Sequence, residues 1–98
     1  CQGSTGPASP RSDRAGVYGS SFPVVTVRDM VRTQARLADA IGIHTWAAVV
    51  GGSMGGMQVL EWGVMFPDRA RALVPIATCA AATAQQIAYW STGRRAIA

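Results

Sequence analysis

The chain has 98 residues, of which 49% are hydrophobic and 14% charged, and its formal net charge is +4. A chain of this length forms one domain at most, and its apolar runs fall far short of the roughly 20 residues that a membrane-spanning helix requires, so we expect a soluble protein without a membrane partner. All nine basic residues are arginines, spread along the chain without interleaved aromatic residues, and this distribution indicates solvated surfaces and no nucleic-acid partner.

Residues 1–25 are rich in Gly, Ser and Pro and show no period of two or 3.6 residues, which predicts a loop. Helical spacing of apolar residues then runs over residues 27–41. Thr26 and Asp29 have the spacing of a capping box, and Gly42 is a typical stop. We therefore predict a helix over residues 27–41. Three arginines that recur every four residues fall on its solvent-facing side: Arg28, Arg32 and Arg36.

Two short apolar runs follow, separated by a helical pattern. Residues 45–50 and residues 71–78 predict strands buried on both faces, with Pro75 as an irregularity in the second. Residues 54–65 predict a helix that ends before Pro67. Residues 83–97 predict a last helix, weakened at Gly93.

The order of these elements is typical of an α/β protein. Strands that alternate with helices of 10 to 15 residues form parallel sheets with right-handed crossovers, so we expect the two strands to be adjacent and parallel. Two strands do not make a stable sheet covered on both faces. We therefore expect an internal piece of a larger α/β enzyme, with a loop over residues 1–25, a strand and helix core over residues 26–82, and the start of a helical lid over residues 83–98.

The most informative motif is G-x-S-x-G in residues 51–55, placed between the first predicted strand and the helix after it. A serine on such a turn has a strained backbone, so the positions two before and two after it need to lack side chains, as Gly51 and Gly55 do. Ser53 is the candidate nucleophile, and the backbone N–H of Met54 is the candidate oxyanion donor. The alternative interpretations are a tight packing turn without chemistry and a phosphate loop, although the chain lacks the GK[ST] and G-x-G-x-x-G patterns.

A serine nucleophile needs a base, and in this fold an acid and then a histidine follow the serine in the sequence. The one histidine, His44, precedes Ser53 and lies at the entry end of its strand. Asp68 follows Pro67 in a turn at that same end and is typical of a turn residue. We therefore expect the base and its acid to lie beyond residue 98, and the isolated chain to show negligible acyl transfer.

The remaining candidates have simpler interpretations. Cys1 and Cys79 are too few for a disulfide framework and lack a zinc-ligand spacing, so we expect no metal and a reducing, cytoplasmic environment. Cys79 is predicted to be a small buried thiol, with a pocket-lining role as the alternative. Trp46, Trp62 and Trp90 are predicted to pack in a core or interface. A pocket role in a lid is the alternative interpretation for Tyr89, Trp90, Arg94 and Arg95.

Three segments of the chain resemble a known family. Residues 1–7 (CQGSTGP), residues 25–31 (VTVRDMV) and residues 49–58 (VVGGSMGGMQ), the last followed by Leu60-Glu61-Trp62, resemble homoserine O-acetyltransferase in order and spacing. The resemblance runs nearly end to end, and the GGSMGGMQ stretch is much more specific than G-x-S-x-G alone.

The resemblance implies an α/β-hydrolase fold with a helical lid and a role in methionine biosynthesis. Ser53 would take the acetyl group from acetyl-CoA, the co-substrate, and pass it to the hydroxyl of L-homoserine by a ping-pong route, with no bound cofactor. Ser53 alone matches the family's triad, because the matching Asp and His fall after the last residue. Gln2 to Pro7 resemble the loop beside the family's pocket, and a homodimer of the full-length protein is left open.

Three alternatives stay open on these residues. A hydrolase and an acyltransferase share the same nucleophile elbow, which is the strand-to-helix turn in residues 51–55 that carries the serine. A serine esterase is therefore one alternative. A related enzyme that uses a succinyl donor or a serine acceptor is another. The third is a catalytically silent segment that keeps the elbow without the Asp and His of a triad.

Overall fold

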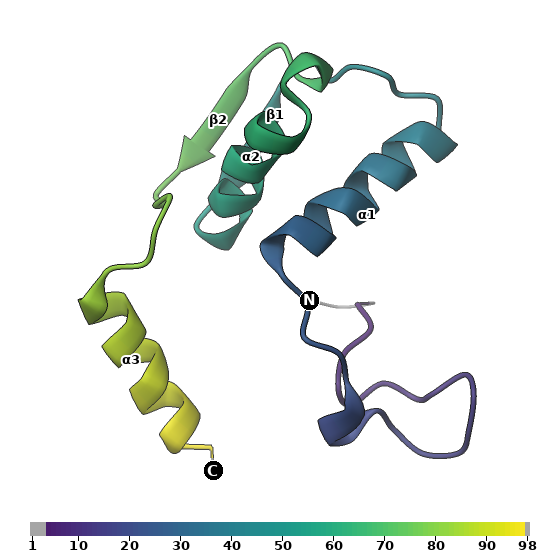
Figure 1. Ribbon diagram of the computed structural model, residues 1–98, viewed down its shortest axis with the longest axis vertical. Helices are drawn as coiled ribbons and strands as arrows, with labels where there is room; N and C mark the ends of the chain where they lie inside the picture. Colours follow the sequence, from purple (N-terminus) through teal and green to yellow (C-terminus); the bar gives the residue numbers. More distant parts are fainter. Residues whose placement is uncertain (1–3, 98) are drawn as a thin grey trace.

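The computed structural model describes residues 4–97, so Cys1, Gln2 and Gly3 at the start of the CQGSTGP segment lie outside the described residues. The elements follow the predicted order of helix, strand, helix, strand, helix (Figure 1). They are α1 (Val27–Ala40), β1 (Val49–Gly52), α2 (Met54–Met65), β2 (Leu73–Ile76) and α3 (Ala84–Arg95), with short 3-10 turns η1 (Gly19–Ser21) and η2 (Pro67–Arg69).

The loop before α1 has more local structure than its composition predicts. Pro10 and Val17 form an isolated antiparallel bridge, which closes part of the loop on itself. Tyr18 and Phe22 then meet edge to face, with ring centroids 5.4 Å apart. The rest remains irregular as predicted, because neither the strand nor the helix period is sustained.

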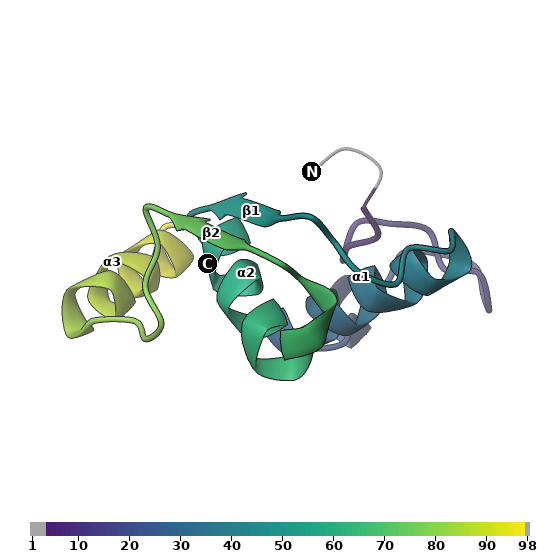
Figure 2. The ribbon, with the colours of Figure 1, turned by 90° about the horizontal axis from the view of Figure 1, so that it is seen from above.

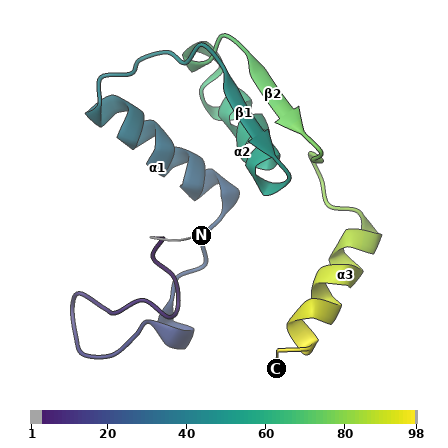
Figure 3. The same cartoon turned by 180° about the vertical axis from the view of Figure 1, so that it is seen from behind.

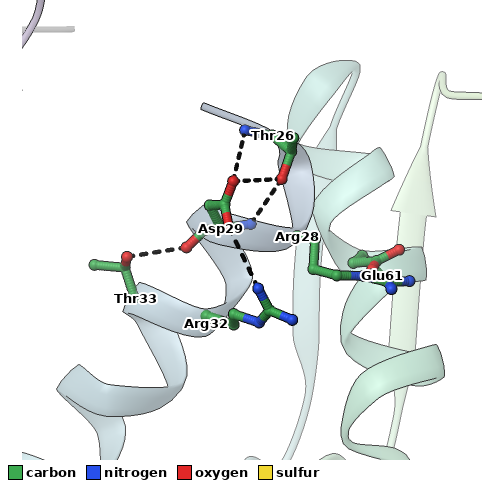
Figure 4. Close-up of polar contacts among 6 residues, drawn as sticks. All are labelled: Thr26, Arg28, Asp29, Arg32, Thr33 and Glu61. Carbon is green, nitrogen blue, oxygen red and sulfur yellow. Dashed lines mark hydrogen bonds and ion pairs between the residues drawn. The ribbon is translucent and has the colours of Figure 1, made fainter. Parts of the chain in front are cut away.

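Both predicted ends of α1 are confirmed. Thr26 accepts a hydrogen bond from the backbone N–H of Asp29 at 3.2 Å, and the Asp29 carboxylate accepts one from the backbone N–H of Thr26 at 3.0 Å (Figure 4). The Thr26 hydroxyl also donates to the Asp29 carboxylate at 2.6 Å, and this bond, followed by the one from the Thr26 N–H, holds the pKa of the Asp29 carboxyl below its usual range. At the other end Gly42 has a φ of 76°, which a residue without Cβ adopts easily.

Thr26→Ala is expected to lower the stability of the protein by about 1 kcal/mol, because the N–H of Asp29 loses its acceptor. Urea unfolding measures this loss. Thr33→Ala is the matched control: the Thr33 hydroxyl donates to the carbonyl of Asp29 within α1 and caps no helix end (Figure 4). That variant should stay within about 0.5 kcal/mol of the parent. Equal losses in the two variants would contradict the capping argument.

The two strands are adjacent and parallel, as predicted. Val49 pairs with Leu73 and Gly52 pairs with Ile76 at the two ends of the register. Both strands are shorter than the apolar runs suggest, and the first is displaced along the chain. Before residue 49 a single parallel bridge joins Trp46 to Ala70. The ladder continues through the two glycines, because their backbone groups pair with β2 in the usual way.

Helix α2 packs against one face of the sheet. In Figure 2 β1 and β2 lie above α2, and in Figure 3 the same strands lie in front of it. Helix α1 packs beside α2 and buries Val31 and Ala35 against Trp62, which is 2% exposed. An ion pair of 2.5 Å joins Arg28 of α1 to Glu61 of α2 (Figure 4), so this arginine does more than face solvent.

The prediction that both strands are buried on both faces is wrong for this chain. All four residues of β2 are exposed, and the residues of β1 alternate between half-buried and exposed. The reason is that α2 covers one face, while no other described element covers the face seen in Figure 3. The layout is correspondingly open: the radius of gyration is 16.1 Å, against about 13 Å for a compact domain of this length.

Helix α3 stands apart from the sheet and has no buried residue (Figure 1). Thr83 and Gln86 form a second capping box at its start, which explains why it begins there. Gly93 does not interrupt it, since the helix continues to Arg95. Among residues 4–97, no helix has the length and apolar character needed to cross a membrane.

Candidate active site

Ser53 forms the sharp turn between β1 and α2. Its backbone angles are φ 54° and ψ −118°, in a region that residues with a Cβ rarely adopt. Such strain persists only where the surroundings enforce it, and it is concentrated at functional sites. The residue is exposed, and its side chain makes no hydrogen bond to the helix that it precedes. The Ser53 hydroxyl therefore lies free at the carboxyl end of a parallel strand and at the start of a helix.

Backbone contacts with the end of β2 fix this turn. The Ser53 N–H donates to the carbonyl of Ile76 at 2.9 Å, and the Ser53 carbonyl accepts from the hydroxyl of Thr78 at 2.7 Å. The N–H groups of Gly56 and Met57 also donate to that carbonyl, at 3.0 and 3.2 Å. The backbone N–H and carbonyl of Ser53 thus both have hydrogen-bond partners, and the side-chain hydroxyl is left available for chemistry.

The steric demand predicted for Gly51 is present. A Cβ added there would lie 2.3 Å from the carbonyl oxygen of Gly55, which is a backbone atom and has little room to move. The prediction that Gly55 must also lack a side chain is wrong, because a Cβ there meets nothing within 4 Å. The second crowded position at this turn is Gly56, where a Cβ would lie 2.6 Å from two carbon atoms of Thr78. The helix packs on the loop after β2 at Gly56, one residue beyond the motif glycine.

The role of the Met54 backbone N–H as an oxyanion donor stays a prediction, and its place at the start of α2 is compatible with that role. Met54 is the first residue of α2, so its N–H has no acceptor inside the helix. It directly follows Ser53, and the positive end of the helix dipole adds to its attraction for a negative oxygen.

His44 and Asp68 are not brought to Ser53. His44 precedes β1, and its carbonyl accepts from the side chain of Arg69 at 3.2 Å. Asp68 is exposed in η2, the turn before β2. Because β1 and β2 are parallel, both residues lie at the end of the sheet opposite Ser53. The prediction that neither residue is the catalytic base agrees with this placement.

Cys79 and Trp90 line one cavity, and Ser53 does not belong to it. The cavity has a volume of about 360 Å³ between α2, the loop after β2 and α3. Cys79 is half-buried and not the buried thiol predicted, because it lies on the wall of this cavity, and its sulfur is 3.6 Å from the Gln86 side chain. Trp90 is 51% exposed and Tyr89 is 80% exposed, so neither is a core residue of the described chain. Trp62 is buried as predicted, and Trp46 packs partly buried against it.

Sequence reasoning missed two supports of the elbow. Gly56 carried a signal, because glycine is unfavourable inside a helix and is usually retained for a packing reason. Thr78 carried none, since its partner lies 25 residues away in the sequence. A second contact set was also missed: Gln34 of α1 accepts from the Trp62 indole at 2.7 Å and donates to Gln58 at 2.5 Å. These bonds tie α1 to the helix that carries the elbow.

Within residues 4–97, no group of three or more His, Cys, Asp or Glu residues is placed to hold a metal ion. The chemistry that the described residues offer is that of an exposed serine hydroxyl with a helix N-terminus beside it. Such an arrangement attacks a carbonyl carbon once a base removes the proton.

Comparisons with known proteins agree with this geometry. The sequence pattern of the family described as alpha/beta hydrolase fold matches residues 1–96. The chain is 54% identical over 97 residues to homoserine O-succinyltransferase from Pseudomonas entomophila (strain L48), covering 99% of this chain and 26% of that protein. It therefore spans about a quarter of the length of the curated relatives that it matches.

Two solved structures share the arrangement of elements. Esterase E22 matches with a TM-score of 0.80 and 36% identity, over 89% of this chain and 24% of that one. Homoserine O-acetyltransferase from Bacillus anthracis matches with a TM-score of 0.63 and 37% identity, over 66% of this chain and 17% of that one. With the strained serine between β1 and α2 and the parallel strand pair, these matches lead to one conclusion: the chain belongs to the alpha/beta hydrolase fold family.

Proposed function

We propose that this chain is the nucleophile segment of a longer acyltransferase, which moves an acetyl group from acetyl-CoA to the side-chain hydroxyl of L-homoserine in methionine biosynthesis. The observation that carries the proposal is the backbone of Ser53, with a φ of 54° and a hydroxyl that no helix N–H binds. Relatives and neighbours named as homoserine O-acyltransferases support the choice of acceptor.

The proposed reaction has two steps. A base from another part of the longer protein takes the proton of the Ser53 hydroxyl, and the oxygen attacks the thioester carbonyl of acetyl-CoA. The negative oxygen formed there is bound by the N–H of Met54, the C–S bond breaks, and CoA leaves as the protonated thiol. The homoserine hydroxyl then attacks the serine ester, loses its proton to the base, and restores the Ser53 hydroxyl.

The acetyl donor is the part of the proposal that relatives support least, since the first of them are named for succinyl transfer. Residues 47–60 and 72–86 form the two segments that meet at Ser53, and neither contains a charged side chain. A succinyl group would bring a carboxylate that needs a cationic partner, whereas an acetyl group brings none. These uncharged segments favour the acetyl donor.

A serine esterase is the second candidate, favoured by the likeness to esterase E22. The same acyl-serine would then be released by water. We propose that the difference lies in the lid, which α3 begins: its exposed Ile87 and Trp90 form an apolar surface suited to covering an acyl-enzyme. Excluding water is what allows a second acceptor to compete for the ester.

Mass spectrometry of the longer protein tests the proposal. Mixed with acetyl-CoA and no homoserine, it should carry an acetyl adduct on the peptide that contains Ser53. Added homoserine should remove the adduct and release O-acetylhomoserine. An adduct formed only with succinyl-CoA would identify a succinyltransferase, and rapid loss of the adduct to water would identify an esterase. An adduct on Cys79 would exclude the serine mechanism.

A further inference from the structure

The Ser53 carbonyl receives hydrogen bonds from two different elements. Gly56 and Met57 donate from the first turns of α2, as the geometry of any helix start requires. The Thr78 hydroxyl donates from the loop after β2, at 2.7 Å, and makes the shortest of the three bonds. Thr78 is therefore the contact that ties this carbonyl to the sheet side of the turn.

The orientation of this carbonyl decides where the Met54 N–H points. Both groups belong to the planar peptide unit between Ser53 and Met54, and no described peptide bond is cis. In a trans peptide the C=O and the N–H point in opposite directions. A bond that fixes the carbonyl therefore also fixes the N–H, and a rotation of the peptide away from Thr78 would turn the oxyanion donor out of the site.

The chain is shaped to place Thr78 there. Ile76 accepts from the Ser53 N–H as the last pair of the ladder, and Ala77 then adopts a φ of 48°. That left-handed conformation is unfavourable for alanine and turns the chain at the end of the strand. The Thr78 side chain occupies the space left by the missing Cβ of Gly56, where an added Cβ would lie 2.6 Å from it. The strained Ala77 and the missing Cβ of Gly56 thus together allow the Thr78 hydroxyl to reach the Ser53 carbonyl.

We propose that Thr78 is a positioning residue that orients the Met54 N–H toward the oxyanion through the shared peptide plane. It contacts neither substrate nor reacting atoms and acts through the Ser53 carbonyl. The proposal rests on the proposed function in taking Ser53 as the nucleophile and the Met54 N–H as an oxyanion donor, and it applies equally to an acyltransferase and to an esterase.

The test compares Thr78→Val, which keeps the shape and removes the hydroxyl, with Thr78→Ser, which keeps the hydroxyl. In the longer protein, the rate at which a fluorophosphonate probe labels Ser53 should fall about 10-fold to 100-fold in Thr78→Val and stay within about threefold of the parent in Thr78→Ser. With the acyl donor, kcat should fall in Thr78→Val while KM stays unchanged, because the oxyanion forms only on the way through the transition state.

Each other outcome has a defined meaning. Equal labelling of the parent and Thr78→Val would overturn the proposal, as would equal losses in Thr78→Val and Thr78→Ser, which would indicate a packing role. If Thr78→Val does not fold, Thr78→Ala removes the same hydroxyl without crowding. A parent that is labelled but transfers no acyl group would refute the proposed function while the variants still decide the role of Thr78. A parent that is not labelled would overturn both.

Discussion

Ser53→Ala should abolish the acyl-enzyme and lower turnover of the longer protein by at least about 10⁴-fold. The hydroxyl oxygen is the atom that bonds to the acyl carbon, and no neighbouring side chain replaces it on the strained turn. Folding should be preserved, because this hydroxyl makes no hydrogen bond to α2 and the backbone contacts with Ile76 remain. Intact-mass measurement with acyl-CoA checks the loss of the acyl-enzyme, and urea unfolding checks that the fold is preserved.

Two companion variants sharpen the result. Ser53→Gly should be as inactive as Ser53→Ala but more stable by about 1 kcal/mol, because glycine adopts a φ of 54° with less strain. Ser91→Ala, on α3, is the control serine and should retain the adduct. Substantial turnover in Ser53→Ala would refute the nucleophile, and a Ser53→Gly variant no more stable than Ser53→Ala would refute the argument from strain.

Gly51→Ala should destabilise the elbow by about 3 kcal/mol and remove most labelling of Ser53 by a fluorophosphonate probe. The added methyl would lie 2.3 Å from the carbonyl oxygen and 2.4 Å from the carbonyl carbon of Gly55. Both atoms belong to the first turn of α2, so relief requires moving the helix start away from β1. That movement would also displace the hydroxyl.

Gly55→Ala is the matched control for this variant, with the same added methyl in the same motif. Nothing lies within 4 Å of the added carbon, and alanine is the better helix former by about 0.5 to 1 kcal/mol. Its stability should be unchanged or slightly higher in urea unfolding. Equal destabilisation by the two substitutions would contradict the packing described for the elbow.

The helices of this protein were predictable because their signals are local. The capping pair Thr26 and Asp29 lies three residues apart, and Gly42 ends the helix by its own backbone preference. The start of α2 followed in the same way from the G-x-S-x-G motif, and its end from the proline after it. The alternation of strands and helices then determined a parallel pair, since a crossover helix leaves few other connections.

The sequence by itself therefore determined the order of elements, the ends of α1 and α2, and Ser53 as the residue on the turn. Tertiary structure decided which glycine is crowded, Gly56 and not Gly55, because the crowding atoms belong to Thr78. It also decided that β2 is exposed, since burial depends on which elements cover a face and not on the apolar run itself. Contacts between segments far apart in the chain leave no periodic signal, and the hydrogen bond from Thr78 to Ser53 is one of them.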